Sequence, residues 1–314
     1  MKPNKYQIFI ARRIWFWFWR ELMNGFAPSD KDGNYKRPKG IKVNNYSKIN
    51  INYNDNLFIL IGSSCPWCHR ILLLYKLMDL SEKIKIIHLQ PNYKKGEWIF
   101  KNKFYENNNL DQLYKNSSFI KAFRSTLPVM IRYKGQKTEL ISNESGDIIK
   151  ILNLIFNNQL KENNFISDCD DDLLNLINDD INDGVYKCGF ARNQNSYIYS
   201  SKRLFSALKD IDTLIKTNGG PWILGKKISV ADIYLFPTLI RWEMIYSKLF
   251  KCTEKEICKF KNIIQWRYRF FNLNGISETC FDKEWLEDYY KAIFPLNPNQ
   301  IIPLQPSLYE IINP

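Results

Sequence analysis

Short apolar runs separated by turns begin at residue 57 and predict an α/β unit. Residues 57–61 form an apolar run with the length of a buried strand. A turn follows at 62–65, and a helix is expected to begin near Pro66, because proline is well tolerated at the first helical position. A second apolar run at 84–89 predicts the next strand. The order so far is therefore strand, helix, strand.

The following region predicts a hairpin and a further helix. Apolar residues at 128–133 and 138–141 flank a turn that contains Gly135, which is typical of paired strands. Residues 145–156 place their apolar side chains at helical spacing. Between the second strand and the hairpin we expect a loop-rich insertion that extends to about Arg124. The sequence thus predicts β-α-β followed by β-β-α.

The second half of the chain shows helical periodicity almost throughout residues 170–290. The run at 229–232 is a Ser-x-x-Asp capping pattern at the start of an apolar helix, which makes Asp232 structural. From residue 294 onward, prolines recur and predict an extended tail without helix.

An aromatic segment precedes the α/β unit. Residues 10–23 read Ile-Ala-Arg-Arg-Ile-Trp-Phe-Trp-Phe-Trp-Arg-Glu-Leu-Met, too interrupted for a secretory signal. In a helix, Trp15, Trp19 and Met23 share one side, which favours an arm packed on the protein's own body. The alternative is a helix on a membrane surface. Residues 27–56 lose this periodicity and predict an irregular connection.

Composition and charge argue against a nucleic-acid-binding, a membrane-spanning or a secreted disulfide-rich protein. The chain has 314 residues, and 45 basic against 32 acidic residues give a net charge of +13. The basic residues are dispersed without a nucleic-acid-binding signature, so a solvated basic surface is expected and no nucleic-acid partner. No apolar run reaches the ~20 residues that span a bilayer. Seven thinly spread cysteines argue against a secreted disulfide framework and favour a cytoplasmic protein.

One segment carries recognisable chemistry: Cys65-Pro66-Trp67-Cys68-His69-Arg70. A thiol at a helix N-terminus faces unpaired N–H groups and the positive end of the helix dipole, which stabilise a thiolate. Cys65 would be the nucleophile, and Cys68, one turn later, could be a resolving thiol. Haem attachment, a zinc site and a purely structural cysteine pair are alternatives. No metal site is expected, because no second such cysteine pair follows and His88 is the only other histidine.

This segment and four others resemble the Xi class of glutathione transferases, the glutathionyl-hydroquinone reductases, which are cysteine-type enzymes related to the omega class. The family's Cys-Pro-Trp-Ala-His-Arg is similar to residues 65–70, and its Thr-Val-Pro-Val-Leu to residues 126–130. Its Ser-Asn-Glu-Ser appears at 142–145, and its Gly-x-x-Trp-like segment at 96–100. A long stretch specific to the class is similar to Asn-Asp-Gly-Val-Tyr-Lys-Cys-Gly-Phe-Ala at 182–191. The resemblance covers roughly residues 57–305.

The resemblance implies a fold and a domain organisation. A thioredoxin-like α/β domain at 57–157 would bind glutathione, and an all-helical domain at 170–293 would bind the acceptor. Outside these domains, the sequence pattern predicts an arm and its connection at 1–56 and a proline-rich tail at 294–314. The family is also homodimeric.

The resemblance also implies site residues, with glutathione as cosubstrate. Cys65 would attack a glutathionyl sulfur or hold glutathione as a mixed disulfide. A cis peptide bond at Pro128 would expose the backbone of Leu127 to glutathione. The remaining glutathione contacts would come from Trp98, Arg124, Glu144 and Ser145. Tyr186 and Tyr289 would face a quinol-type substrate and donate hydrogen bonds to its oxygens.

Cys68 departs from the family, which mostly has alanine at that position. A second thiol permits an intramolecular disulfide and therefore a glutaredoxin-like disulfide or dehydroascorbate reductase. The sequence also leaves open a non-enzymatic, membrane-associated binding protein in which residues 10–23 contact the membrane surface.

Overall fold

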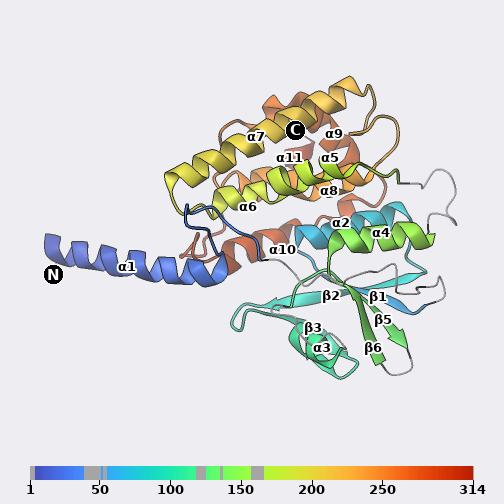
Figure 1. Ribbon diagram of the computed structural model, residues 1–314, viewed down its shortest axis with the longest axis horizontal. Coiled ribbons are helices and arrows are strands. Elements are labelled where there is room, and N and C mark those ends of the chain that lie inside the picture. The colour runs from blue at the N-terminus through green and yellow to red at the C-terminus, as the bar shows by residue number, and fades with distance from the viewer. Residues whose placement is uncertain are drawn as a thin grey trace.

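The structure is a computed structural model that describes residues 4–38, 51, 55–117, 125–134, 137–156 and 166–313. A six-stranded sheet forms one layer, and helices α2 and α4 separate it from a mainly helical second half (Figure 1). The α/β part comprises β1 (Leu57–Gly62), α2 (Pro66–Leu77), β2 (Ile84–Asn92), β3 (Glu97–Phe104), β4 (Asn107–Asn109), α3 (Leu110–Asn116), β5 (Val129–Lys134), β6 (Lys137–Ser142) and α4 (Ser145–Phe156).

The strand order in the sheet is β4-β3-β2-β1-β5-β6. Strands β1 and β2 are parallel, and the other described pairs are antiparallel. All six residues of β1 are buried, and because successive side chains point to opposite faces, they contribute to two cores. Leu57, Ile59 and Ile61 pack with α2 and α4, whereas Phe58 and Leu60 pack with α3. A continuous apolar run is the pattern expected of such a central strand.

The second half is helical, as the periodicity predicts. Its segments are α5 (Asp171–Asn175), the π-helical η4 (Leu176–Asn182), α6 (Gly184–Gly189), α7 (Gln194–Thr217), α8 (Val230–Leu239), the π-helical η5 (Trp242–Tyr246), the 3₁₀ turn η6 (Ile257–Lys259), α9 (Lys261–Phe271), the 3₁₀ turn η7 (Ser277–Thr279), α10 (Asp282–Glu287), the π-helical η8 (Asp288–Ala292) and α11 (Leu308–Ile312).

Two expectations about regular structure are wrong. The loop-rich insertion contains β3, β4 and α3 in its described part, and β3 extends the sheet by pairing with β2. Asparagine is depleted in strands, so Asn107–Asn109 gives no strand signal, yet the Asn109 side chain caps α3 by accepting from the Gln112 N–H. The proline-rich tail ends in α11, because Ser307 and Glu310 form a reciprocal cap and Leu308 and Ile312 are buried one turn apart.

The expectation that the aromatic arm packs on the protein's own body holds for its last turns and is wrong for the rest. The arm is helix α1 (Lys5–Phe26), and Met23 is its one fully buried side chain. Only its last turns contact the body: Trp19 donates to the carbonyl of Pro295, and Phe26 packs edge-on against Phe190. The rest of α1 extends beyond the body (Figure 1). None of the helices in the described ranges is long and apolar enough to cross a membrane.

Asp232 holds the start of α8, as its capping pattern predicts. One carboxylate oxygen accepts from both the N–H and the hydroxyl of Ser229, at 2.8 and 2.6 Å. The other accepts from the N–H of Ile223 and from the indole of Trp266, at 3.0 and 2.7 Å. Burial raises the pKa of Asp232, and these hydrogen bonds oppose that shift. One buried carboxylate therefore satisfies four donors from three segments.

We expect Asp232→Ala to lower the free energy of unfolding by about 3–5 kcal/mol, because it leaves several buried donors without an acceptor. Asp210, an exposed aspartate on α7, provides the matched control. Asp210→Ala should change stability by less than about 0.5 kcal/mol. Urea unfolding followed by circular dichroism measures both, and equal effects of the two variants would contradict the structural role of Asp232.

Candidate active site

Cys65 lies where β1 passes into α2. It occupies the N-cap position, with φ −72° and ψ 120°, and Pro66 begins the helix as the sequence predicts. The half-buried Cys65 thiol points toward the backbone of Leu127, with its Sγ 3.7 Å from the carbonyl oxygen. The Leu127–Pro128 peptide bond is cis, as the resemblance implies.

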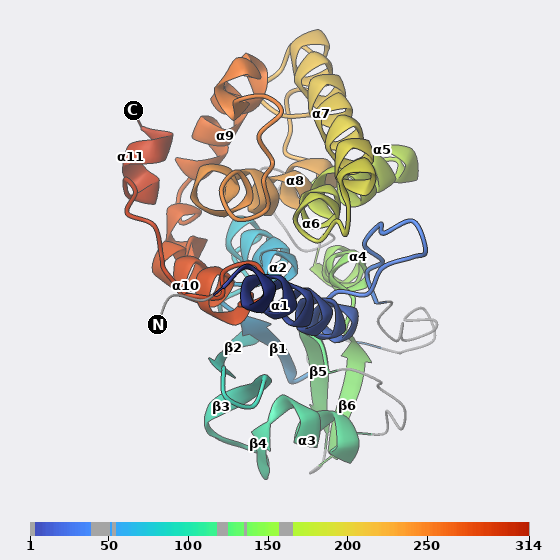
Figure 2. The same ribbon diagram turned by 90° about the vertical axis from the view of Figure 1, so that its left-hand side faces the viewer.

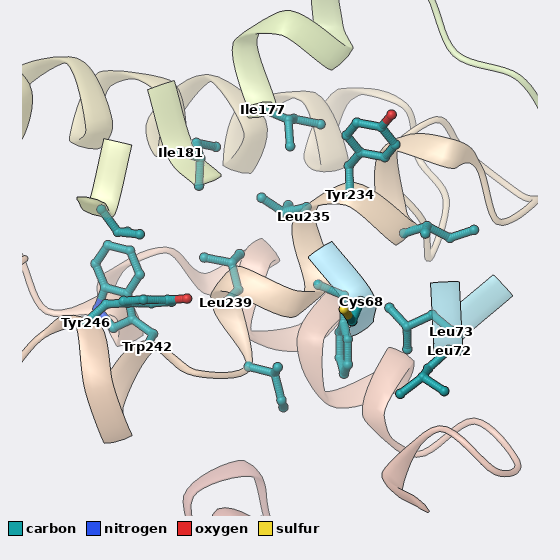
Figure 3. Close-up of a cluster of buried hydrophobic side chains, with 14 of the residues drawn as sticks. Cys68, Leu72, Leu73, Ile177, Ile181, Tyr234, Leu235, Leu239, Trp242 and Tyr246 are labelled. Carbon is teal, nitrogen blue, oxygen red and sulfur yellow. The ribbon is translucent and has the colours of Figure 1, made fainter. Parts of the chain in front are cut away.

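Cys68 lies one turn further along α2 and is fully buried. Its sulfur accepts a hydrogen bond from the Gly62 N–H at 3.4 Å, and apolar side chains surround it (Figure 3). Both cysteines are reduced thiols. Burial raises the pKa of Cys68 well above its usual value. Cys68 is therefore a protonated donor at neutral pH.

The Cys68 thiol acts on Cys65 as a hydrogen-bond donor. This hydrogen bond is the main cause that lowers the pKa of Cys65 to about 7, and burial opposes it. The backbone N–H groups of Cys68 and Trp67 and the charge of Arg241 act in the same direction as the thiol. A substantial fraction of Cys65 is therefore thiolate at neutral pH, which is the reactive form of cysteine.

His69 connects α2 to the helical half and takes no part as a base. Arg241 donates to its Nδ1 at 2.9 Å, so Nε2 carries the proton and donates to the Thr279 hydroxyl at 2.8 Å. Burial, reinforced by the charge of Arg241, lowers the pKa of His69 well below its usual value. The ring is therefore neutral and oriented by its surroundings. Arg241 also stacks on Trp285, 3.8 Å from the ring centre.

A cavity of about 640 Å³ opens beside Cys65. Trp98, Tyr186 and Tyr289, three of the predicted site residues, line it together with Cys65 and with Phe26 from α1. Trp98 covers Gly62 so closely that a Cβ atom at residue 62 would lie 2.5 Å from its ring. The structure thus brings together residues from both halves of the chain.

Three tyrosine hydroxyls form a chain at this cavity. The Tyr289 hydroxyl lies 2.6 Å from that of Tyr186 and 3.0 Å from that of Tyr246. Burial is the main cause that raises the pKa of Tyr186 and of Tyr289 well above the usual value, so both phenols stay protonated. The sequence reasoning missed Tyr246, because nothing in its helical, apolar context distinguishes it from an ordinary packed tyrosine.

The predicted γ-glutamyl contacts lie apart from this cavity. Glu144 lines a second, more polar cavity of about 1000 Å³, and no described residue lines both cavities. Ser145 is buried at the start of α4, where its hydroxyl accepts from Arg70 at 3.2 Å. Arg124 lies outside the described residues.

Arg37 stands between the two cavities, and the sequence reasoning missed it. Its guanidinium lies 3.9 Å from the ring centre of Trp67 and 4.8 Å from that of Tyr186. It also forms an ion pair with Asp183 at 2.5 Å. Trp67 lines the cavity of Cys65, whereas Arg37 and Asp183 line the cavity of Glu144. No sequence signal links an arginine in an irregular connection to an aspartate 146 residues later.

A cysteine at a helix N-terminus, a mixed sheet and a following helical half define the fold of a glutathione transferase. Family models agree: the glutathione S-transferase N-terminal domain matches residues 64–154, and the C-terminal domain matches residues 200–269. The chain belongs to the glutathione S-transferase family, and the predicted thioredoxin-like domain followed by an all-helical domain is confirmed. It is an enzyme of this class, which removes the non-enzymatic alternative.

Similar proteins include glutathionyl-hydroquinone reductases and an Xi-class transferase. The chain is 28% identical to glutathionyl-hydroquinone reductase YqjG of Escherichia coli, over 80% of each chain. It is 27% identical to glutathionyl-hydroquinone reductase PcpF of Sphingobium chlorophenolicum, over 78% of this chain and 81% of that one. The glutathione-bound structure of YqjG superposes with a TM-score of 0.72 at 28% identity, covering 82% of this chain and 86% of that chain. The Xi-class transferase of Phanerochaete chrysosporium shares the fold, with a TM-score of 0.76 at 23% identity, over 88% and 94% of the two chains.

We expect Cys68→Ala to move the midpoint of Cys65 alkylation to higher pH, because it removes the strongest donor to the thiolate. Cys68→Ser keeps a donor at the same position and should leave the midpoint close to the wild-type value of about 7. Alkylation by iodoacetamide across a pH series, followed by peptide mass spectrometry, isolates Cys65 from the other cysteines. Identical midpoints for the alanine variant and the wild type would contradict this account.

We expect Arg37→Met to lower the free energy of unfolding by about 1–2 kcal/mol, because a stacked cation is lost and Asp183 loses its partner. The adjacent and exposed Lys36 provides the control, and Lys36→Met should have an effect below about 0.5 kcal/mol. Thermal unfolding measures both variants. If they are equally stable, Arg37 does not tie the connection to α2.

Proposed function

We propose that this enzyme uses glutathione to reduce S-glutathionyl-hydroquinones, with Cys65 as the nucleophile. The observation that carries the proposal is the Cys65 thiol, with a pKa lowered to about 7, at the N-terminus of α2 and in a cavity with Tyr186 and Tyr289. The names of its relatives YqjG and PcpF support the same substrate class.

Two displacement steps balance this reaction. The Cys65 thiolate attacks the sulfur of the glutathionyl adduct, and the bond from that sulfur to the ring carbon breaks. The electron pair stays with the ring carbon, which takes up a proton to give the hydroquinone, while Cys65 and glutathione are left as a mixed disulfide. A second glutathione thiolate attacks this disulfide, which releases oxidised glutathione and restores the Cys65 thiolate. Glutathione is thus the reductant.

In this proposal Tyr186 and Tyr289 bind the aromatic ring of the hydroquinone substrate. Because Tyr186 and Tyr289 remain protonated and line the cavity, their hydroxyls can donate to the substrate's oxygens as negative charge develops there. Tyr246 orients Tyr289 through the hydroxyl contact at 3.0 Å. Trp98 forms an apolar wall beside the site.

The proposed glutathione contacts come from the family resemblance. The backbone of Leu127, before Pro128, lies against Cys65 and is the proposed partner of the glutathione cysteine. Glu144 and Ser145, at the start of α4, are the proposed γ-glutamyl site, where a carboxylate and helix N–H groups suit an amino acid head group. Arg124 remains the proposed partner of the glycyl carboxylate.

A glutathione that contacts both Cys65 and Glu144 would run beside the stacked Arg37 and Trp67, because Trp67 lines the cavity of Cys65 and Arg37 lines that of Glu144. We further propose a homodimeric, cytoplasmic enzyme, and domain limits at 57–157 and 170–293, on the basis of the family resemblance.

A second candidate is a disulfide or dehydroascorbate reductase that uses Cys65 and Cys68 as a dithiol. The observation in its favour is the position of Cys68 one turn after Cys65 on α2, where its thiol lowers the pKa of Cys65. In that reaction the Cys68 sulfur would attack the Cys65 mixed disulfide, release glutathione and form an intramolecular disulfide. The burial and raised pKa of Cys68 favour the one-thiol route, because little thiolate is available for the attack.

Glutathione-dependent reduction of glutathionyl-menadiol tests the proposal. We expect Cys65→Ala to lower kcat about 10³-fold or more, since the nucleophile is lost. Cys68→Ala should retain activity at neutral pH within about tenfold, because it lowers the fraction of Cys65 that is thiolate but leaves the nucleophile in place. Cys258→Ala, at an exposed cysteine, is the control and should match the wild type.

Two results would contradict parts of the proposal. Equal losses for Cys65→Ala and Cys68→Ala would make the dithiol essential and favour the second candidate. A wild-type protein that binds glutathione but does not turn over glutathionyl-menadiol would remove the hydroquinone substrate while leaving the glutathione site in place.

A further inference from the structure

Helix α1 exposes an unusual amount of aromatic surface. Figure 2 shows α1 emerging beside α10 in front of the α/β layer, and Figure 1 shows it extending away from the body. Along it, ten large apolar side chains are 39–70% exposed: Tyr6, Ile8, Phe9, Ile10, Ile14, Trp15, Phe16, Trp17, Phe18 and Leu22. Such contiguous exposed apolar surface marks an interaction site.

The charges of α1 lie mainly on one side. With 3.6 residues per turn, its four cations fall within a sector of about 100°, namely Lys5, Arg12, Arg13 and Arg20. The opposite side carries Ala11, Ile14, Trp15, Phe18 and Leu22, together with the polar Gln7 and Glu21. Glu21 is the one acid of the helix. The cations are thus gathered on one side, whereas aromatic residues lie all around the helix, with Phe9 and Phe16 among the cations.

We propose that α1 lies on the surface of an anionic lipid bilayer, with its apolar side in the interface and its cations on lipid phosphates. Tryptophan suits this depth because its ring is apolar while its N–H can stay hydrated, and phenylalanine and leucine bury wholly apolar side chains beside it. Arginine side chains can bury their stems while their charged ends reach the headgroups. The net charge of +13 attracts the whole protein to the same surface.

Charge and shape favour a lipid surface over a second copy of the chain. Two copies of α1 would bring together eight cations and two acids, which repel unless an anionic partner intervenes. The apolar side of α1 is also much wider than the two positions per heptad that pair helices in a coiled coil. An anionic bilayer complements both features.

The base of α1 is anchored, so lipid binding would orient the enzyme. Met23 is fully buried, the Trp19 indole donates to Pro295 at 2.9 Å, and the Arg192 guanidinium lies 5.5 Å from the Trp19 ring. Phe26, at the last residue of the helix, lines the cavity of Cys65. A bilayer-bound α1 would therefore hold the mouth of this cavity close to the membrane.

Cosedimentation with vesicles tests the proposal on the full chain. We expect the wild type to sediment with vesicles of phosphatidylcholine and phosphatidylserine, and much less with phosphatidylcholine alone. Replacing both Arg12 and Arg13 with Gln should weaken binding about 30-fold, because each cation near the surface contributes roughly fivefold. Replacing the exposed, adjacent Lys226 and Lys227 with Gln removes the same charge elsewhere and should have a much smaller effect.

The apolar side requires its own variant. Trp15→Glu combined with Phe18→Glu should abolish sedimentation, whereas Leu304→Glu, at a fully exposed residue of the tail, should leave it unchanged. Absence of wild-type binding to either vesicle, or equal effects of arm and control variants, would overturn the proposal. So would an arm-dependent dimer that forms without any vesicle binding, because α1 would then dock on a second copy.

Discussion

The hydrogen bond that Arg241 donates to His69 fixes the position of α2 between the two halves of the molecule. Arg241 lies just after the end of α8, in the helical half. The other ring nitrogen of His69 donates to the hydroxyl of Thr279, which is also in the helical half. Arg241 also stacks on Trp285, whose indole donates to the carbonyl of Ser63 at 3.0 Å, next to the turn that carries Cys65. The helix that presents the thiol is therefore braced by the helical half. The position of the Cys65 sulfur therefore depends on contacts with the helical half as well as on the sheet.

The same arrangement explains how a half-buried thiol can be acidic. Removing a thiolate from water is costly, so donors and a positive charge must replace the lost hydration. Helix N–H groups, Arg241 and the Cys68 thiol do this for Cys65. Cys68 can donate because it remains protonated, and a protonated thiol is a poor nucleophile. The features that make Cys68 a good donor to Cys65 thus make it a poor resolving thiol.

Sequence patterns predicted the elements whose burial is continuous or strictly periodic. Strand β1, helix α2, the hairpin and α4 are of this kind, and the cysteine at the start of α2 followed from them. Strand β4 was missed because three asparagines carry no apolar signal. Arg37 and Arg241 were missed for a different reason. Each has partners more than 140 residues away, and a charge at one position does not indicate which distant side chain it will meet. The resemblance supplied Tyr186 and Tyr289, which periodicity does not distinguish from other packed tyrosines.

The segment from Phe26 to Arg37 joins the arm to both cavities, although it lies outside the residues that the family models match. Phe26 lines the cavity of Cys65, and Arg37 lines that of Glu144. Between them the chain is fixed to the start of α7, where Asn193 donates to the carbonyl of Asp32. Gly33 permits this approach, because its φ of +86° suits glycine and a Cβ atom there would lie 2.5 Å from the Asn193 amide. A displacement of α1 would therefore act first on the wall of the Cys65 cavity, at Phe26. The residues that the family models match include the reactive cysteine, while the N-terminal segment before them supplies part of the walls of both cavities.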